Sequence, residues 1–144
     1  MKNTVSITNK ALGTSFEEDF AQMLYEEGFW VHLLTQNAAG QPADVIAVKG
    51  KTAYLIDCKV CSDDRFPLSR IEDNQHSSME LWRDCGNGEA WFALKISQGQ
   101  IFMIPHYSMK ALTNFGDKAS LSVKEMAEYG VTYEKWIKKI CKSL

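Results

Sequence analysis

The chain of 144 residues contains no apolar run that approaches the roughly 20 residues of a membrane-spanning helix. Its opening segment, MKNTVSITNK, also lacks the apolar stretch of a secretory signal peptide. These two absences argue against a membrane protein and predict a cytoplasmic one. Repeats, low-complexity tracts and linkers are missing too, so a single domain over residues 1–144 is expected.

Cysteine is scarce, and only Cys58 and Cys61 stand close together, as a single C-x-x-C. A structural zinc site needs four ligands, and the sequence offers no second close pair. Cys58 lies between Asp57 and Lys59 on a predicted strand, so its side chain should point to the face opposite theirs. We therefore expect reduced cysteines packed in a core.

An excess of positive charge, common in nucleic-acid-binding proteins, is also missing, since the net charge is −2. This balance neither indicates nor excludes a nucleic-acid partner, because the distribution of charge matters more than its sum. A metal-dependent nuclease also gathers carboxylates, which lower the net charge until the cation binds.

The hydrophobic pattern predicts an α/β fold. A helix is expected over 13–28, with a capping box at Ser15 and Glu18, a stop at Gly28 and four apolar side chains facing the core: Phe16, Phe20, Met23 and Leu24. Three strands are expected next, at 29–35, 44–48 and 53–60, and then a helix at 69–84. Two more strands at 89–97 and 99–106 and a helical tail from about 107 complete the pattern. This order predicts a mixed five-stranded sheet flanked by helices.

Three charged residues stand out in the two strands at 44–48 and 53–60. Asp57 and Lys59 are two positions apart, which places both on one face of a strand. Asp44 begins the neighbouring strand, and a short turn makes the two strands antiparallel, so Asp44 should meet Asp57 across the sheet. Two converging carboxylates suit a hard divalent cation such as Mg²⁺, and a nearby lysine suits an attacking water or a developing phosphate charge. A plain ion pair between Lys59 and an aspartate is the structural alternative.

Several segments resemble one nuclease superfamily. PAD followed by IDCK resembles the PD-(D/E)XK signature, and GTSFEEDF resembles the first helix of Holliday junction resolvases, where a glutamate matches Glu17. RFPLSRIEDNQH resembles the segment after the active-site strand of bacterial RecU-type resolvases, where a glutamine matches Gln75. GNGEAWFALKI then resembles the next strand, and the likeness covers about residues 13–104.

The resemblance implies a restriction-endonuclease-like core and a metal-dependent endodeoxyribonuclease acting on four-way DNA junctions. It implies that Glu17, Asp44 and Asp57 hold Mg²⁺, with Mn²⁺ as a substitute, and that Lys59 orients or deprotonates water. Hydrolysis would leave a 5′-phosphate, and symmetric cleavage of a junction needs two sites, so a homodimer is expected. On the apolar face of its helix, Gln75 is expected either to act toward Lys59 or the attacking water or to make a plain core hydrogen bond.

The chain departs from the resolvase pattern at specific places. Leu12 stands where an arginine is frequent, and Asn74 stands before the glutamine where a histidine is usual, with His76 on the other side. The long stalk of RecU-type enzymes is replaced by QNAAGQP, as in the compact archaeal-type resolvases. A bacterial or phage-encoded protein is expected. Two rival functions remain: a nuclease of the same fold acting on other DNA, such as a phage or mobile-element endonuclease, and a non-catalytic module that binds DNA or a protein partner. The joint presence of the predicted site residues argues against the second.

Four polar residues near the predicted site are candidates for DNA binding. Gln36 and Asn37 precede Asp44 in a loop, and Arg65 and Arg70 flank the segment after the active-site strand. Ordinary loop polarity explains the first two equally well, and isolated arginines are often surface residues. The remaining histidines, His32 and His106, are expected to be structural.

Overall fold

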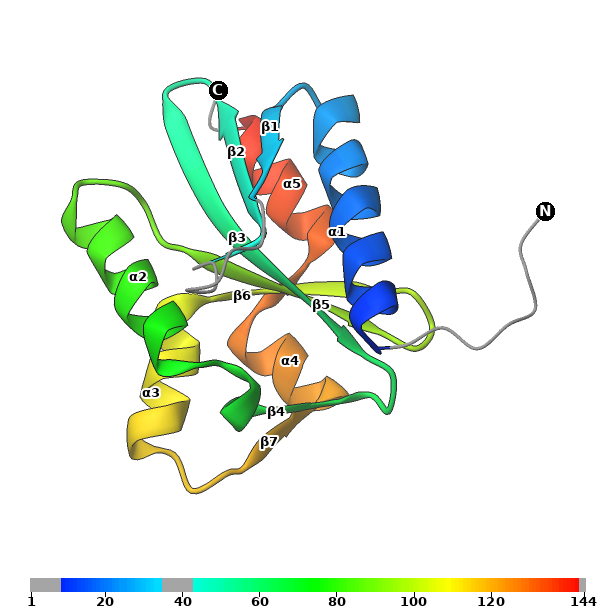
Figure 1. The fold of residues 1–144 in the computed structure, drawn as a ribbon, viewed down its shortest axis with the longest axis vertical. Helices are drawn as coiled ribbons and strands as arrows, with labels where there is room; N and C mark the ends of the chain where they lie inside the picture. Colours follow the sequence, from blue (N-terminus) through cyan, green and yellow to red (C-terminus); the bar gives the residue numbers. More distant parts are fainter. Residues whose placement is uncertain (1–8, 35–42, 143–144) are drawn as a thin grey trace.

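The computed structural model describes residues 9–34 and 43–142 (Figure 1). The first helix, α1 (Asn9–Glu26), begins before the predicted start at residue 13. Ser15 and Glu18 therefore lie inside the helix and do not cap it, because Lys10, Ala11 and Leu12 are good helix formers and extend it. None of the helices in the described part of the chain is long and apolar enough to cross a membrane.

Helix α1 ends as predicted, at a glycine. Gly28 has a φ of 92°, a left-handed conformation that glycine adopts without steric cost. The N–H of Phe29 donates to the carbonyl of Leu24 at 3.1 Å and that of Gly28 to Tyr25 at 3.0 Å, which is the Schellman pattern. Leu24 and Phe29 are both buried in the same cluster, so the chain turns directly into the sheet.

Within the residues that the structure describes, the main sheet has six strands rather than the predicted five. They are β1 (Trp30–Leu33), β2 (Val45–Lys49), β3 (Thr52–Cys61), β5 (Trp91–Ile96), β6 (Ile101–Pro105) and β8 (Val131–Thr132), in the order β1-β2-β3-β5-β6-β8. Among these strands only β3 and β5 pair in parallel, and helix α2 (Asp73–Asp84) lies between them in the chain, so the predicted mixed sheet is confirmed. The additional strand, β8, has two residues, too few for a periodic pattern.

Residues 62–68 are more regular than the sequence indicated. Strand β4 (Arg65–Pro67) pairs with β7 (Ser120–Ser122) in a small separate sheet, and a 3₁₀ turn, η1 (Leu68–Arg70), follows. Helix α2 (Asp73–Asp84) consequently begins four residues later than predicted, because Glu72 caps it. The C-terminal part contains α3 (His106–Phe115), α4 (Val123–Tyr129) and α5 (Tyr133–Lys142).

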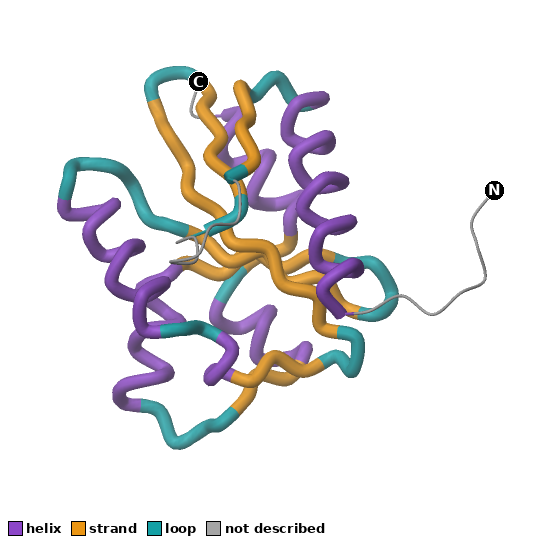
Figure 2. Tube along the Cα trace, in the orientation of Figure 1, coloured by secondary structure: helices purple, strands orange, loops and turns teal. Residues whose placement is uncertain are grey.

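Helices cover both faces of the main sheet (Figures 1 and 2). Helices α1 and α5 share one hydrophobic cluster with β2, β3 and β6, and the predicted core positions Phe16, Phe20 and Leu24 are buried there. Helices α2, α3 and α4 share a second cluster with the opposite face. Because side chains alternate along a strand, β3 contributes Ile56 and Cys58 to the first cluster and Leu55 and Cys61 to the second.

The four cysteines are all free. Cys58 and Cys61 are buried, as expected for core residues, and Cys58 lies in the cluster formed with α1 and α5. Cys85 and Cys141 are exposed, so the prediction of packed cysteines holds for the C-x-x-C pair alone.

Candidate active site

Strand β3 carries Asp57 and Lys59 on the face that turns toward α2. Their neighbours on that face, Leu55 and Cys61, belong to the cluster with α2, whereas Ile56 and Cys58 pack toward α1. Asp57 is 2% exposed, which makes it one of few buried charged groups. Burying a carboxylate is costly unless it is paired, bound to a cation or neutralised.

Asp44 immediately precedes β2 and lies beside Asp57, as predicted. The antiparallel register pairs Val45 with Ile56, which brings the preceding and following residues together. The Asp44 N–H donates to the Ile56 carbonyl at 3.1 Å, and the Leu34 N–H donates to the Asp44 carbonyl at 2.8 Å. The side-chain Oδ2 of Asp44 accepts a hydrogen bond from the backbone N–H of Cys58 at 2.7 Å. The Asp44 backbone is therefore held by Ile56 of β3 and by Leu34, next to β1, and its buried side chain is held by the backbone of β3.

The Asp57 carboxyl group has two polar partners and one incompletely satisfied oxygen. Oδ1 accepts the Gln75 Nε2–H at 3.1 Å, and Oδ2 forms an ion pair with Lys59 Nζ at 3.1 Å. Within the described residues, Oδ2 is buried and makes no aligned hydrogen bond. Burial, with repulsion from Asp44 second, raises the Asp57 pKa to about 8, although the Lys59 ammonium acts to lower it.

Glu17 reaches the Asp44 carboxyl group from α1. Its side chain is partly buried, and the pKa of Glu17 is raised to about 7 by that burial and then by the negative charge of Asp44. The opposing attraction of Lys59 is the weakest influence on this pKa. Glu17, Asp44 and Asp57 therefore interact electrostatically although they come from separate elements.

Three crowded carboxyl groups and an under-satisfied buried oxygen have the chemistry to bind a hard divalent cation. A cation would neutralise the repulsion that raises the pKa values of Glu17 and Asp57. Across residues 9–34 and 43–142, however, no set of three Asp, Glu, His or Cys side chains is already arranged to ligate one ion. The assignment of these residues as metal ligands therefore stays a prediction.

Gln75 contacts Asp57 and not Lys59. It is the third residue of α2, where its Oε1 accepts the Glu72 N–H at 3.3 Å in a capping box. Because this bond occupies the amide oxygen, the amide nitrogen faces the Asp57 carboxyl group. Gln75 is buried, and both ends of its amide are bonded.

The candidate DNA-binding residues differ in what the structure reveals. Gln36 and Asn37 lie outside the described residues. Arg65 and Arg70 are exposed, and each also contacts its own chain. Arg65 Nε donates to Ser120 Oγ at 3.2 Å, and Arg70 Nη1 donates to the Val60 carbonyl at 2.8 Å. A role in DNA binding stays a prediction for these residues.

A histidine pair near the site was not predicted from the sequence. His76 Nδ1 and His106 Nε2 lie 2.9 Å apart, although the residues are 30 positions apart in the chain. His106 begins α3, whereas the sequence placed it at the end of a strand. No local pattern signals such a pair, because it arises only when α2 packs beside α3.

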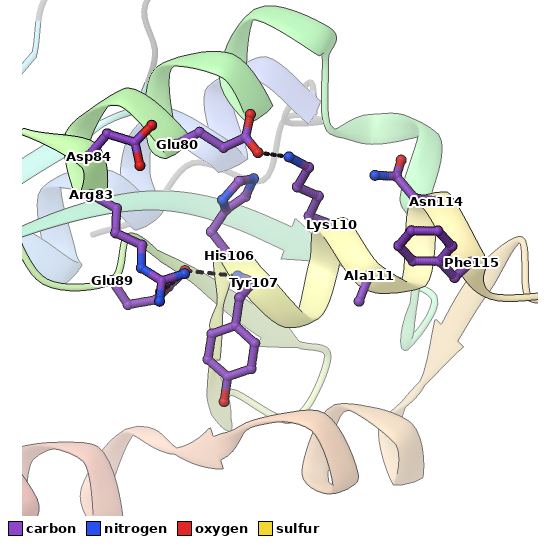
Figure 3. A pocket seen from close by; sticks show the side chains of 10 residues that line it. All are labelled: Glu80, Arg83, Asp84, Glu89, His106, Tyr107, Lys110, Ala111, Asn114 and Phe115. Carbon is purple, nitrogen blue, oxygen red and sulfur yellow. Dashed lines mark hydrogen bonds and ion pairs between the residues drawn. The ribbon is translucent and has the colours of Figure 1, made fainter.

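His106 also lines a pocket of about 320 Å³ between α2 and α3 (Figure 3). Ion pairs join Glu80 to Lys110 and Arg83 to Glu89 at its walls. None of the predicted site residues lines this pocket, so it is separate from Glu17, Asp44 and Asp57.

The sequence from residue 8 to residue 142 matches the model of the archaeal Holliday junction resolvase (Hjc) family. The chain belongs to this family. Among curated protein sequences there is no significant match. A solved structure of Archaeoglobus fulgidus Hjc, described as a Holliday junction resolvase from an archaeal hyperthermophile, has the same fold, with a TM-score of 0.67 and 20% sequence identity over 87% of this chain and 99% of that chain.

Membership of the Hjc family decides between the two kinds of resolvase that the sequence resembles. The compact archaeal type is confirmed, and with it the expected resolvase fold. The expectation of a bacterial or phage-encoded protein finds no support, because the matched family and the matched structure are archaeal.

Proposed function

We propose that this Hjc-family chain resolves four-way DNA junctions by metal-dependent hydrolysis of phosphodiester bonds. The supporting observation is the convergence of Glu17, Asp44 and Asp57, whose mutual repulsion and burial raise the pKa of two of them. These residues would hold Mg²⁺, with Mn²⁺ as a substitute. When bound, the cation neutralises charge on the scissile phosphate and lowers the pKa of water.

Asp44 and Asp57 would provide fixed ligand atoms because the sheet holds their backbones rigidly. Asp44 is bonded through its N–H, its carbonyl and its side chain to neighbouring strands. Asp57 lies near the middle of the ten-residue strand β3, which pairs on both sides. Rigid placement of this kind reduces the reorganisation needed during the reaction.

Lys59 would act on the reacting phosphate or on the attacking water. Its side chain is 17% exposed, compared with 3% for that of Asp57, so its ammonium group reaches the solvent side of the site. An ammonium group there stabilises negative charge that develops on the phosphate. In this structure the same group pairs with Asp57 Oδ2 at 3.1 Å.

Gln75 would keep the Asp57 carboxyl group in a fixed orientation. Its amide donates to Oδ1 and leaves Oδ2 as the oxygen without an aligned hydrogen bond. That oxygen is the one available to a cation. This role differs from the expected action on Lys59 or water, because the amide contacts the carboxyl group itself.

Two copies of the chain would act on one junction. Cutting two strands symmetrically requires two sites, and a two-fold homodimer supplies them. Most contacts of a protein that recognises the shape of DNA go to phosphates, so the exposed Arg65 and Arg70 are candidates for this role.

The proposal is tested with a labelled four-way junction, a flap and a linear duplex of the same sequences, each with Mg²⁺ or EDTA. Paired nicks in the junction that need Mg²⁺ and disappear in Lys59→Ala support it. Equal cleavage of all three substrates would keep the chemistry and remove the junction preference. Binding without cleavage in any metal would favour a non-catalytic DNA-binding module.

A further inference from the structure

The histidine pair connects the sheet to the helix that carries Gln75. The backbone N–H of His106 donates to the Ala90 carbonyl at 2.8 Å. The centroid of its ring lies 6.3 Å from that of the Phe92 ring. With 3% exposure, His106 is fixed against the sheet, and its ring extends from the start of α3 toward α2 (Figure 3). His76 on α2 meets this ring at 2.9 Å.

Both imidazoles are neutral near pH 7. Burial, and then the charge of its neighbour His76, lowers the His106 pKa to about 4. Burial lowers the His76 pKa as well. In a neutral pair, one ring donates an N–H and the other accepts it, so the 2.9 Å contact is an ordinary hydrogen bond.

The hydrogen bond to His106 is made by His76, which lies in the first turn of α2 directly after Gln75. In the same turn, the Gln75 amide accepts from Glu72 and donates to Asp57 at 3.1 Å. The strength of a hydrogen bond falls steeply with distance and angle, so a small shift of this turn would break the Asp57 contact. Met79, the buried apolar anchor of α2, lies a full turn further along.

We propose that His106, acting through His76, is a positioning residue that holds the first turn of α2 so that Gln75 donates to Asp57. Neither histidine has to contact DNA or a cation for this role. The inference rests on the proposed function of the Asp57 site, because it predicts an effect on cleavage. The bond between the rings is also measurable without cleavage.

A double-mutant cycle tests the link in single-turnover cleavage of a four-way junction. His106→Ala is expected to slow cleavage about tenfold, the effect of losing one hydrogen bond of about 1.4 kcal/mol. In a Gln75→Ala background the same change is expected to have almost no further effect, because the bond that it supports is already gone. Junction affinity should be unchanged. The control is His32→Ala, because His32 is an exposed histidine on β1.

The second readout is the side-chain amide NMR signal of Gln75, assigned by its loss in Gln75→Ala. Slow exchange of this amide with solvent is expected in the unmodified chain and faster exchange in His106→Ala, with partial recovery in His106→Gln. His76→Ala breaks the same bond from the less buried side and serves if His106→Ala does not fold.

Three results would overturn the inference: equal slowing by His106→Ala in both backgrounds, no slowing in either, or unchanged exchange of the Gln75 amide. A chain that cuts no DNA would instead contradict the proposed function. In that case the amide exchange alone still decides whether the histidines position Gln75.

Discussion

Replacing Asp57 by asparagine should stabilise the metal-free protein at neutral pH while it abolishes cleavage. Burial and Asp44 raise the Asp57 pKa from an ordinary 3.8 to about 8. Because the folded pKa is the higher one, the native protein binds more protons than the unfolded chain between about pH 4 and pH 8. The free energy of unfolding should therefore fall as the pH rises through this window.

The size of the effect follows from the span of the window. Each pH unit inside this window lowers the free energy of unfolding by at most about 1.4 kcal/mol. The unmodified protein should therefore lose up to about 4 kcal/mol of stability between pH 5 and pH 8. Asparagine at position 57 has no such proton to lose. The stability gained by Asp57→Asn should be largest at pH 8 and shrink toward pH 4.

Urea unfolding in EDTA at several pH values measures this dependence, with Asp63→Asn, an exposed aspartate beyond the end of β3, as the control. Added Mg²⁺ should restore stability at pH 8 to the unmodified protein and not to Asp57→Asn. An unmodified protein that is more stable at pH 8 than at pH 5 would refute the reasoning. It would identify the Asp57–Lys59 contact as a stabilising ion pair, the structural alternative.

Three further changes have distinct expected outcomes. Lys59→Met should slow single-turnover cleavage by about 100-fold without weakening junction binding in gel-shift titrations, because it removes the charge that acts on the phosphate. Gly130→Ala should destabilise the fold by about 1–3 kcal/mol in urea unfolding, because its Cβ would lie 2.4 Å from the Met103 carbonyl oxygen, whereas Gly88→Ala, with no atom within 4 Å, should not. Arg70→Ala should weaken junction binding and reduce the slope of log affinity against log salt by about 1, and an unchanged slope would exclude a phosphate contact.

The main features of the site could be predicted because they are encoded locally. Asp57 and Lys59 share a face through strand alternation, and a short turn brings Asp44 beside them. Glu17 could be placed only through the resemblance to resolvases. Its helix packs on the far face of the sheet, so no local pattern reveals that its carboxyl group reaches Asp44.

The features that escaped prediction depend on packing between distant segments. Strand β8 has two residues, and β4 and β7 have three each, so none shows a readable alternation. The contact of His76 with His106 needs α2 and α3 to lie side by side. The sequence left two roles open for Gln75, action toward Lys59 or water and a plain core hydrogen bond. Its capping bond to Glu72, which depends on where α2 begins, directs the amide nitrogen to Asp57.

Single-turnover cleavage of a four-way junction by Glu17→Gln and Glu18→Gln, with Mg²⁺ varied, tests the central claim most directly. The two residues are neighbours on α1. Asp44 raises the pKa of the partly buried Glu17, whereas the Glu18 side chain is exposed. If Glu17, Asp44 and Asp57 hold the metal, Glu17→Gln should need much more Mg²⁺ and cleave slowly, while Glu18→Gln cleaves normally. Equal cleavage by both variants at every Mg²⁺ concentration would contradict the three-carboxylate metal site.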